Sequence, residues 1–467
     1  MKITEVPNTW ILDEGLRLDP RPYVGGAIRL RKRVLELPHS RLETVTTGFR
    51  GGIFTHLFSP KRTYVGDRKY GVPFLGASSM LQADLSDLPL LSKRDAESRS
   101  YQPLKIKPGM TLISCSGSVG RMAYARGSME GMASAGDLLK IQPDPEKIPP
   151  GYLYAFLRSE VGAALVSGGT YGTIVQHLER QHVADIPVPR LGKRIETEVH
   201  SLIDEAARLR DEASDVFWKA DSLFVELLSL PQPIAQNGYP APQISQSTSA
   251  EFVRRADAYY YAPLNTDARR AFDSAKVTVT LGKIAEVFIP GIFKRQYATD
   301  PSYGVPYITG VDVFRLVPIT DQYLLKRVAE DVGLVLRKGM IVIQEAGQLG
   351  GLIGRSVLVG DSLDGYACSN NMVRVIANDA GDTGYLYAVL ASTYGMRLIS
   401  REAAGSSIPH IDAGRVRALS IPWPERGIRM RIGKLVIDAQ RRRDEAINVE
   451  RKAVRIVEDA IENGESN

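Results

Sequence analysis

Apolar residues recur in a strict heptad between residues 194 and 230, the most regular pattern in this chain. The steps alternate between four and three residues, which keeps one apolar seam along a helix that packs against a partner helix. A helix of this length would be roughly 55 Å long at about 1.5 Å of rise per residue, which suits a spacer. The predicted seam consists of Ile195, Val199, Leu202, Ala206, Leu209, Ala213, Val216, Ala220, Leu223, Leu227 and Leu230.

The same seam recurs 233 residues later, between residues 426 and 462. Of ten mapped positions nine are apolar, and only Arg442 interrupts them, so we expect Arg442→Leu to strengthen the pairing of the helices. The second seam consists of Ile428, Ile432, Leu435, Ala439, Ala446, Val449, Ala453, Ile456 and Ala460.

The charges that flank the two seams favour pairing between them. Residues 194–230 hold nine acidic residues and four Lys or Arg, whereas residues 426–462 hold ten Lys or Arg and seven acidic residues. Opposite charges beside two apolar seams select the partner helix. The alternative is that two solvated amphipathic helices dock separately, each on its own domain.

The rest of the chain is one unit written twice, and eight matched segments follow the same order at offsets of 230 to 239 residues. Seven of them pair GGIF at 51 with PGIF at 290, YGVPFL at 70 with YGVPYI at 303, GMTLISCSGSVG at 109 with GMIVIQEAGQLG at 339, GYLYAFLRS at 151 with GYLYAVLAS at 384, GTIVQHL at 172 with GSSIPHI at 405, IPVP at 186 with IPWP at 421, and RDEA at 210 with RDEA at 443. The eighth pairs Arg17, Leu18, Asp19 and Tyr23 with Arg255, Ala256, Asp257 and Tyr261. Each copy mixes short β-rich runs with helical spacing, which predicts a mixed α+β (α/β) globule in front of each long helix.

The segments between globules and helices set the organisation. The X-Pro steps in IPVP and IPWP disfavour helix and separate each globule from its helix. Residues 231–250 are rich in Pro, Gln, Ser and Ala, a linker composition. In an antiparallel pair of helices this linker spans the shortest distance, so an antiparallel pair is favoured. That arrangement predicts two similar globules at opposite ends of the pair, related by an approximate two-fold axis.

Composition adds little to this picture. The net charge of +6 and pI near 9.1 lean mildly towards a polyanion partner. Two cysteines, Cys115 and Cys368, are too few for a disulfide framework, so we expect buried thiols and a reducing cytoplasm. The first residues lack a signal-peptide pattern and no run of eighteen apolar residues occurs, so we expect a protein that is neither exported nor membrane-spanning.

On these paired segments and their exits into heptads, the chain resembles the specificity subunit of type I restriction-modification enzymes, from about residue 10 to residue 462. The resemblance implies target-recognition domain 1 at residues 1–193, spacer coiled-coil helix 1 at 194–230, a linker at 231–250, target-recognition domain 2 at 251–425 and spacer coiled-coil helix 2 at 426–462. It further implies a cytoplasmic phage-defence complex. In that complex each recognition domain reads half of an asymmetric bipartite site in double-stranded DNA. The helices bind two methyltransferase (modification) subunits, which restriction or translocase subunits join.

Polar loops that differ between the copies are the candidate DNA contacts, because two different half-sites require different readers. The alternative is that each residue belongs to an ordinary solvated loop, and for Ser116, Ser118 and Arg121 that the glycines form a plain hairpin turn. His177 and His410 occupy the same place in both copies, which favours a structural hydrogen bond over a DNA contact. The candidates are Arg50, His56, Lys61, Arg62, Arg68, Lys69, Ser116, Ser118, Arg121, Tyr171, Thr173, Gln176, Lys294, Arg295, Gln296, Tyr297, Gln348 and Ser406.

Motifs for catalysis are missing from the sequence. The Asn/Asp-Pro-Pro-Tyr/Phe element of adenine methyltransferases and the phosphate-binding G-x-x-x-x-G-K-[ST] loop do not occur, and six histidines show no metal-ligand spacing. We therefore expect a non-catalytic targeting subunit without its own cofactor or metal, and S-adenosylmethionine on the methyltransferase partner. The alternatives are a similar subunit of a related phage-defence or fused-type restriction-methylation system, a scaffold that does not read DNA, or an unrecognised enzyme.

Overall fold

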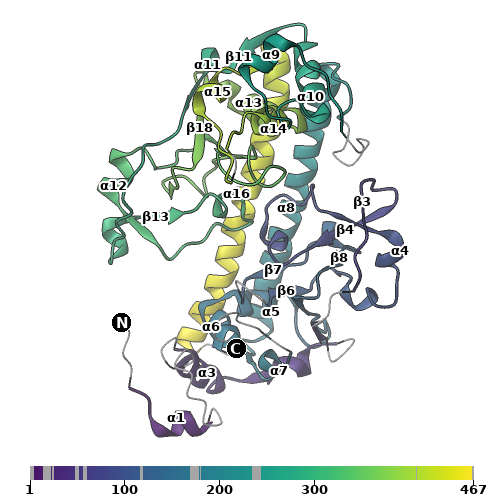
Figure 1. Ribbon diagram of the computed structural model, residues 1–467. Helices are drawn as coiled ribbons and strands as arrows, with labels where there is room; N and C mark the ends of the chain where they lie inside the picture. The colour runs from purple at the N-terminus through teal and green to yellow at the C-terminus, as the bar shows by residue number, and fades with distance from the viewer. Residues whose placement is uncertain are drawn as a thin grey trace. The chain divides into compact units, whose positions relative to one another are not determined.

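The structure of this chain is a computed structural model that describes residues 5–13, 23, 26–47, 52–55, 60–115, 119–168, 178, 180–233, 243–405 and 407–464. It forms two units, unit 1 from Met1–Asp211 with Glu445–Asn467 and unit 2 from Glu212–Asp444. Two long helices, α8 (Lys193–Leu227) and α16 (Arg426–Asn463), contribute residues to both units. Figure 1 shows α8 in teal and α16 in yellow.

Unit 1 contains two four-stranded sheets, in the orders β2-β9-β6-β7 and β3-β5-β4-β8, and the antiparallel pair β1-β10. The strands are β1 (His39–Arg41), β2 (Ile53–Phe54), β3 (Tyr64–Val65), β4 (Gly71–Leu75), β5 (Leu90–Ser92), β6 (Thr111–Ser114), β7 (Met122–Tyr124), β8 (Ala133–Ser134), β9 (Leu138–Ile141) and β10 (Pro187–Pro189). The shorter helices are α1 (Asn8–Asp13), α3 (Ala27–Leu35), α4 (Lys93–Ala96), α5 (Pro150–Arg158), α6 (Glu160–Gly168) and α7 (Arg180–Ala184).

Unit 2 repeats this topology with sheets β12-β18-β15-β16 and β14-β13-β17 and the pair β11-β19. The strands are β11 (Thr278–Thr280), β12 (Ala285–Phe288), β13 (Gly304–Ile308), β14 (Tyr323–Leu325), β15 (Ile341–Gln344), β16 (Ser356–Leu358), β17 (Ala367–Cys368), β18 (Met372–Ala377) and β19 (Ser420–Pro422). The shorter helices are α9 (Ser249–Arg254), α10 (Pro263–Asp273), α11 (Leu281–Ile284), α12 (Lys326–Asp331), α13 (Thr383–Ala391), α14 (Thr393–Arg401) and α15 (Ala413–Arg417). The mixed helix and strand content agrees with the predicted fold class.

The same local contacts shape both units. The Ser159 hydroxyl accepts the Gly162 N–H at the start of α6, and Ser392 does the same for Gly395 at the start of α14. A Cβ on Gly162 would lie 2.0 Å from the Phe156 carbonyl oxygen, so only glycine fits where these helices meet. Because the sequence repeats these residues at one offset, it repeats the helix pair that they specify.

A buried cation links the two main sheets within each unit. On β9, the Lys140 ammonium donates to the Ser134 hydroxyl on β8 at 3.1 Å and to the Leu138 carbonyl. Burial lowers the pKa of Lys140 to about 7. In unit 2 the Arg374 guanidinium of β18 donates to the carbonyls of Cys368 on β17 and of Ser369. These bonds fix the sheet that carries the candidate site, β3-β5-β4-β8 in unit 1 and β14-β13-β17 in unit 2, on the other main sheet of the same unit.

Each unit packs its globule on parts of both long helices. In unit 1, Ile195 and Val199 of α8 share one core with Ala453 and Val457 of α16. In unit 2, Ala220 of α8 shares one with Ile432 of α16. The N-terminal part of α8 therefore lies with the C-terminal part of α16 in unit 1, and the reverse holds in unit 2.

The predicted seam residues are buried or half-buried. Ile195, Val199, Leu209 and Ile432 are buried, whereas Leu202, Val216, Leu223, Leu227, Ile428, Leu435, Val449 and Ile456 are half-buried. A second apolar stripe is buried as well, and it includes Ile203, Phe224, Val436 and Val457. Within unit 2, the ring of Phe224 lies 6.2 Å from Phe272 and 6.3 Å from Tyr385. The apolar face of each helix is thus wider than contact with one partner helix requires, because each helix also packs against the globules.

Arg442 interrupts the seam as the heptad predicts, but it is not an unpaired defect. Within unit 2 its guanidinium donates to the Glu212 carboxylate of α8, and its Nε donates to Asp438 at 3.1 Å. Replacement by leucine would remove a charge pair that joins the two helices. The effect of Arg442→Leu on the pairing of the helices stays a prediction.

Candidate nucleic-acid interface

Four basic residues meet on unit 1 because of the register between β3 and β5. Tyr64 pairs with Leu91, and the Ser92 N–H donates to the Thr63 carbonyl at 2.8 Å. β5 ends at Ser92 and α4 begins at Lys93, and the Thr63 N–H donates to the Asp95 carboxylate of α4 at 2.8 Å. The segment that carries Lys61 and Arg62 therefore meets the first turn of α4, which carries Lys93 and Arg94. We call Lys61, Arg62, Lys93 and Arg94 the basic edge of unit 1; all four are exposed.

Unit 2 builds the same cluster at the same register. Tyr297 forms a bridge with Leu324, and the Leu325 N–H donates to the Gln296 carbonyl at 3.0 Å. Here Lys294, Arg295, Lys326 and Arg327 form the basic edge of unit 2, and all four are exposed. The predicted candidates Lys61, Arg62, Lys294 and Arg295 are therefore matched between the units, although the sequence analysis treated this loop as divergent.

Sequence reasoning missed half of each edge. Lys93 and Arg94 begin α4, and Lys326 and Arg327 begin α12, about thirty residues along the chain from their neighbours. The signal that could have found them is the constant offset of 233 residues, which aligns both Lys-Arg pairs of one copy with those of the other.

Aromatic rings hold the edges in place. The Arg62 guanidinium lies 4.9 Å from the centre of the Phe74 ring, and Tyr64 packs edge-on against the same ring. In unit 2, Tyr297 packs edge-on against Tyr307, which is the counterpart of Phe74. Beside Lys93 and Lys326, the register of β4 and β13 places the exposed Tyr70 and Tyr303.

Other predicted candidates are exposed but belong to one unit only. The Arg68 guanidinium donates to the Ser86 carbonyl, and the Lys69 ammonium lies 5.4 Å from the centre of the Tyr70 ring. The residues at the corresponding positions of unit 2 are Pro301 and Ser302. Arg68 and Lys69 are therefore distinct features of unit 1, next to its basic edge.

Arg121 and Gln348 lie at the turns that follow β6 and β15. The Arg121 N–H donates to the Ser114 hydroxyl, and Gln348 is exposed. Gly120 and Gly350 have φ values of 83° and 80°, the left-handed conformation that a tight hairpin turn requires of glycine. This geometry favours the hairpin interpretation of the glycines.

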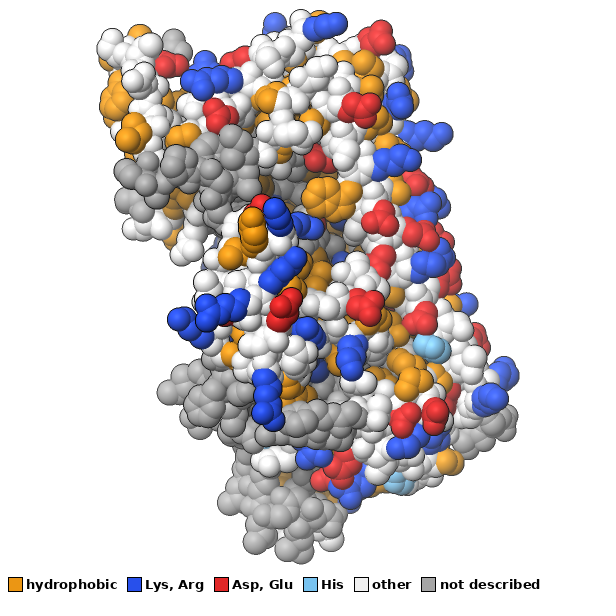
Figure 2. Space-filling model, turned by 90° about the vertical axis from the view of Figure 1, so that its right-hand side faces the viewer, with side chains coloured by type: hydrophobic (Ala, Val, Ile, Leu, Met, Phe, Trp, Pro, Cys, Tyr) orange, Lys and Arg blue, Asp and Glu red, His pale blue; other side chains and the backbone are white. Residues whose placement is uncertain are grey.

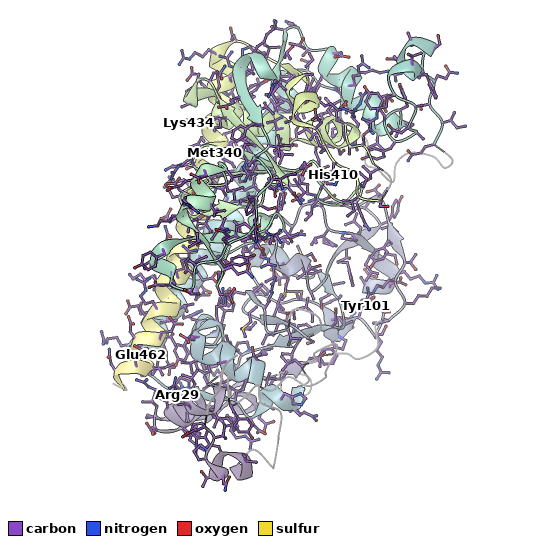
Figure 3. The ribbon with its side chains drawn as sticks, turned by 60° about the vertical axis from the view of Figure 1, so that its left-hand side comes forward. Arg29, Tyr101, Met340, His410, Lys434 and Glu462 are labelled. Atoms are coloured by element: carbon purple, nitrogen blue, oxygen red, sulfur yellow. The ribbon has the colours of Figure 1, made fainter. Side chains whose placement is uncertain are left out.

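Several predicted candidates lie outside the described residues: Arg50, His56, Ser116, Ser118, Tyr171, Thr173, Gln176 and Ser406. His177 lies outside them too, but its counterpart His410 (Figure 3) contacts the Glu345 carboxylate at 3.0 Å and pairs through its backbone with Ala404. This hydrogen bond supports a structural role for the histidine. Cys115 and Cys368 are both buried, and burial raises the pKa of each thiol to about 11.

Charge alone does not outline the interface. Figure 2 faces the side of the molecule that carries β3 and α4, where Lys and Arg side chains gather, yet acidic side chains are mixed among basic ones over much of that view. Among the described residues, Lys61, Lys93 and Arg94 form no ion pair. The same holds for the four residues of the basic edge of unit 2. Such uncompensated cations attract a polyanion more strongly than paired ones.

Unit 2 also contains a cavity of about 270 Å³ between α9, α10 and α14. Its lining combines Arg269 and Arg401 with Glu251, Asp273 and Glu402. The Arg401 guanidinium stacks 3.8 Å from the centre of the Tyr260 ring, and Arg269 pairs with Glu251 and Asp273. These internal pairs leave a cavity of mixed charge that favours no ligand class.

Within the described ranges, no group of three or more His, Cys, Asp or Glu side chains has the geometry of a metal site. In the same part of the chain, no helix combines the length and hydropathy needed to cross a bilayer.

No family model matches the sequence, and no curated protein matches it. Among solved structures, the chain is similar to the type I restriction-modification S subunit from M. genitalium (11% identity, 92% of this chain and 96% of that chain, TM-score 0.36). It is also similar to the HsdS subunit from Thermoanaerobacter tengcongensis (14% identity, 91% and 97% coverage, TM-score 0.28). A third similar structure concerns assembly and conformational transition of the type I R-M system (14% identity, 91% and 98% coverage, TM-score 0.27).

The case for a function rests on the duplicated residues and contacts of this chain.

Proposed function

We propose that this chain is the sequence-specific DNA-recognition subunit of a type I restriction-modification complex. The carrying observation is the duplication: two units share topology, register and buried contacts, yet differ in exposed residues such as Arg68 and Lys69. Equal scaffolds with unequal surfaces suit a reader of two different half-sites, because base choice depends on side chains at base edges.

In this proposal the recognition domains span residues 1–193 and 251–425, and α8 and α16 form an antiparallel coiled-coil spacer with approximate two-fold symmetry. The cross-helix contacts within each unit, Arg442 with Glu212 among them, support the antiparallel direction. A rigid spacer would fix the distance between the half-sites. Half-sites about one helical turn apart, roughly 34 Å, face the same side of B-DNA.

The outer face of α16 is the proposed docking surface for two methyltransferase subunits. It exposes Lys434 (Figure 3) together with the apolar side chains of Met430 and Ile437, which are 43% and 48% exposed. Exposed apolar side chains set among charges are typical of protein–protein interfaces. We propose that catalysis, S-adenosylmethionine and restriction or translocase activity belong to these partners, in the cytoplasm, and that this chain binds and positions.

The test is to purify the chain with its methyltransferase partner and to sequence the modified bases of DNA treated with the complex. The proposal expects one asymmetric bipartite motif with a fixed gap. Methylation that requires the chain but follows no motif would favour a scaffold that does not read DNA. A motif that persists without this chain would assign recognition to the partner.

The spacer makes a separate prediction. Deleting one heptad from each of α8 and α16 shortens the pair by roughly 10 Å, which corresponds to about three base pairs of rise. The gap of the methylated motif should shorten accordingly, while both half-sites keep their bases. An unchanged gap would show that the helices do not set the spacing.

A further inference from the structure

We infer that the two basic edges are a matched pair of phosphate-contacting sites, one on each unit, which hold the DNA backbone and read no bases. The inference deepens the proposed function and rests on it, because it takes duplex DNA as the ligand. It divides the exposed residues of each unit into those that give affinity and those that give specificity.

The geometry of each edge suits a row of phosphates. In unit 1 the Ser92 N–H donates to the Thr63 carbonyl, and the next residues of these two segments are Lys93 and Arg62. In unit 2 the Leu325 N–H donates to the Gln296 carbonyl, and the next residues are Lys326 and Arg295. One backbone contact thus brings the two Lys-Arg pairs of each unit together. Lys and Arg at this density neutralise phosphates and release the counterions that surround them.

The identity of the two edges argues against base reading. Lys-Arg stands at 61–62 and 294–295, and again at 93–94 and 326–327, each time next to the matched backbone contact of Ser92 with Thr63 or of Leu325 with Gln296. Identical side chains on equivalent backbones make equivalent contacts, so they cannot distinguish two different half-sites. Contacts to the sugar-phosphate backbone are the same for every sequence, and they set the position of a protein on the duplex.

Two tyrosines accompany the cations in each unit. Tyr64 and Tyr70 are 49% and 58% exposed, and Tyr297 and Tyr303 are 46% and 70% exposed. A tyrosine hydroxyl beside cations can donate to a phosphate oxygen. Their repetition at one register, next to the cations, points to the same ligand.

The residues that differ beside the edges are then the candidates for specificity. Arg68 and Lys69 of unit 1 correspond to Pro301 and Ser302 of unit 2, and Asp95 corresponds to Val328. Asp95 accepts the Thr63 N–H at 2.8 Å, so it also orders the strand that carries Lys61 and Arg62. Backbone contacts and base contacts would thus come from adjacent positions on the same sheet.

The experiment uses the complex of the full chain with its methyltransferase partner. It compares a duplex that carries the mapped motif with a duplex of equal length and composition that lacks it. The variants are Lys61→Gln with Arg94→Gln, Lys294→Gln with Arg327→Gln, and all four substitutions together. Lys147→Gln with Lys276→Gln removes two exposed lysines outside the edges and serves as the matched control. Circular dichroism verifies that each variant is folded.

The inference expects each pair of substitutions to weaken binding to both duplexes by the same factor, about fivefold for each lost phosphate contact near 0.15 M salt. The slope of log K against log salt should fall in magnitude by about 0.9 for each contact. The two pairs should have equal effects, the methylated motif should stay the same, and Lys61→Arg with Lys294→Arg should retain binding.

Three results would overturn the inference. The variant with all four substitutions could bind both duplexes as the control does. It could lose binding only to the duplex that carries the motif, or it could methylate an altered motif. Either of the last two results would make these residues base readers. If the unaltered complex bound neither duplex, the proposed function would fail instead, and the two failures are therefore distinguishable.

Discussion

Unit 1 and unit 2 anchor the same arginine in two different ways. In unit 1, the buried Arg210 of α8 forms an ion pair with the buried Glu450 of α16 at 2.6 Å, and the Tyr154 hydroxyl donates to the same carboxylate at 2.9 Å. The residues 233 positions away in unit 2 are Arg443, Phe217 and Tyr387. There the Arg443 guanidinium lies 4.1 Å from the centre of the Phe217 ring, which packs 5.8 Å from Tyr387.

The difference teaches how a duplicated chain avoids pairing a helix with the wrong partner. A charge pair and a cation–π contact are both favourable. The two arginines cannot exchange partners, however, because only α16 carries Glu450 and only α8 carries Phe217. A buried charge pair gives specificity more readily than stability, since its desolvation offsets much of its attraction. The predictions below test this comparison, in order of decreasing effect.

Removal of the Glu450 carboxylate should have the largest effect on stability. Glu450→Ala removes the carboxylate that pairs with the buried Arg210 guanidinium, and we expect the free energy of unfolding of unit 1 to fall by about 3–5 kcal/mol. Denaturant unfolding followed by circular dichroism measures this loss. Asp459→Ala, an exposed acid on the same helix, is the control and should change stability by no more than about 0.5 kcal/mol. Equal effects of the two substitutions would refute the account of the pair.

A second pair of anchors ties a loop of each globule to its own helix. In unit 2 the buried Asp444 accepts the N–H groups of Asp361 and Ser362 and the Ser362 hydroxyl. In unit 1 the more exposed Asp211 accepts from Ser128 and pairs with Arg126. We expect Asp444→Ala to cost about 2–3 kcal/mol, because it leaves buried donors unpaired. Asp211→Ala should cost at least as much, because the Arg126 side chain, only 4% exposed, loses its carboxylate partner. Thermal unfolding of both variants would contradict this account if Asp211→Ala were neutral.

Phe217→Ala should be milder than Glu450→Ala. It removes a half-buried ring from Arg443 and Tyr387, but the half-buried Arg443 can still reach water, so we expect a loss of about 1–2 kcal/mol in unit 2. Phe217→Leu keeps the apolar area and should lose only the ring contact, about 0.5–1 kcal/mol. A loss as large as that of Glu450→Ala would show that the aromatic contact carries more than packing.

Low pH should weaken the Arg210–Glu450 pair but not the contact of Arg443 with Phe217. Burial opposes ionisation of Glu450, but Arg210 and Arg158, with hydrogen bonds from Arg210 and Tyr154, outweigh it and hold its pKa below the ordinary value. A lowered folded pKa adds stability above the unfolded pKa, about 4.3, which is lost as pH falls through the folded pKa. The stability advantage of the wild type over Glu450→Gln should therefore shrink below about pH 4. Phe217 has no such titration, so a Phe217→Leu comparison should stay flat over the same range.

The sequence predicted the elements that depend on periodic or repeated residues. The heptads locate α8 and α16, and the repeated Ser-Gly and Tyr positions specify the same helix pairs in both copies. It did not predict the second buried stripe that includes Ile203 and Phe224, because a heptad describes one partner and these helices each carry a globule as well.

The candidate site shows where local reasoning ends. Lys61 and Arg62 stand out as a basic loop, but Lys93 and Arg94 join them only through the register of β3 with β5, which is a tertiary property. The ion pair of Arg442 could not be predicted for the same reason, because its partner Glu212 lies on the other helix. Contacts between distant segments depend on register, and composition does not reveal register.

The central claim is that each unit reads one half of a bipartite DNA site. The most direct test replaces residues 1–193 with the recognition domain of another specificity subunit and maps the methylated motif of the hybrid complex. The account predicts a motif in which one half changes while the other half and the gap stay the same. A motif that is unchanged, or one in which both halves change together, would contradict it.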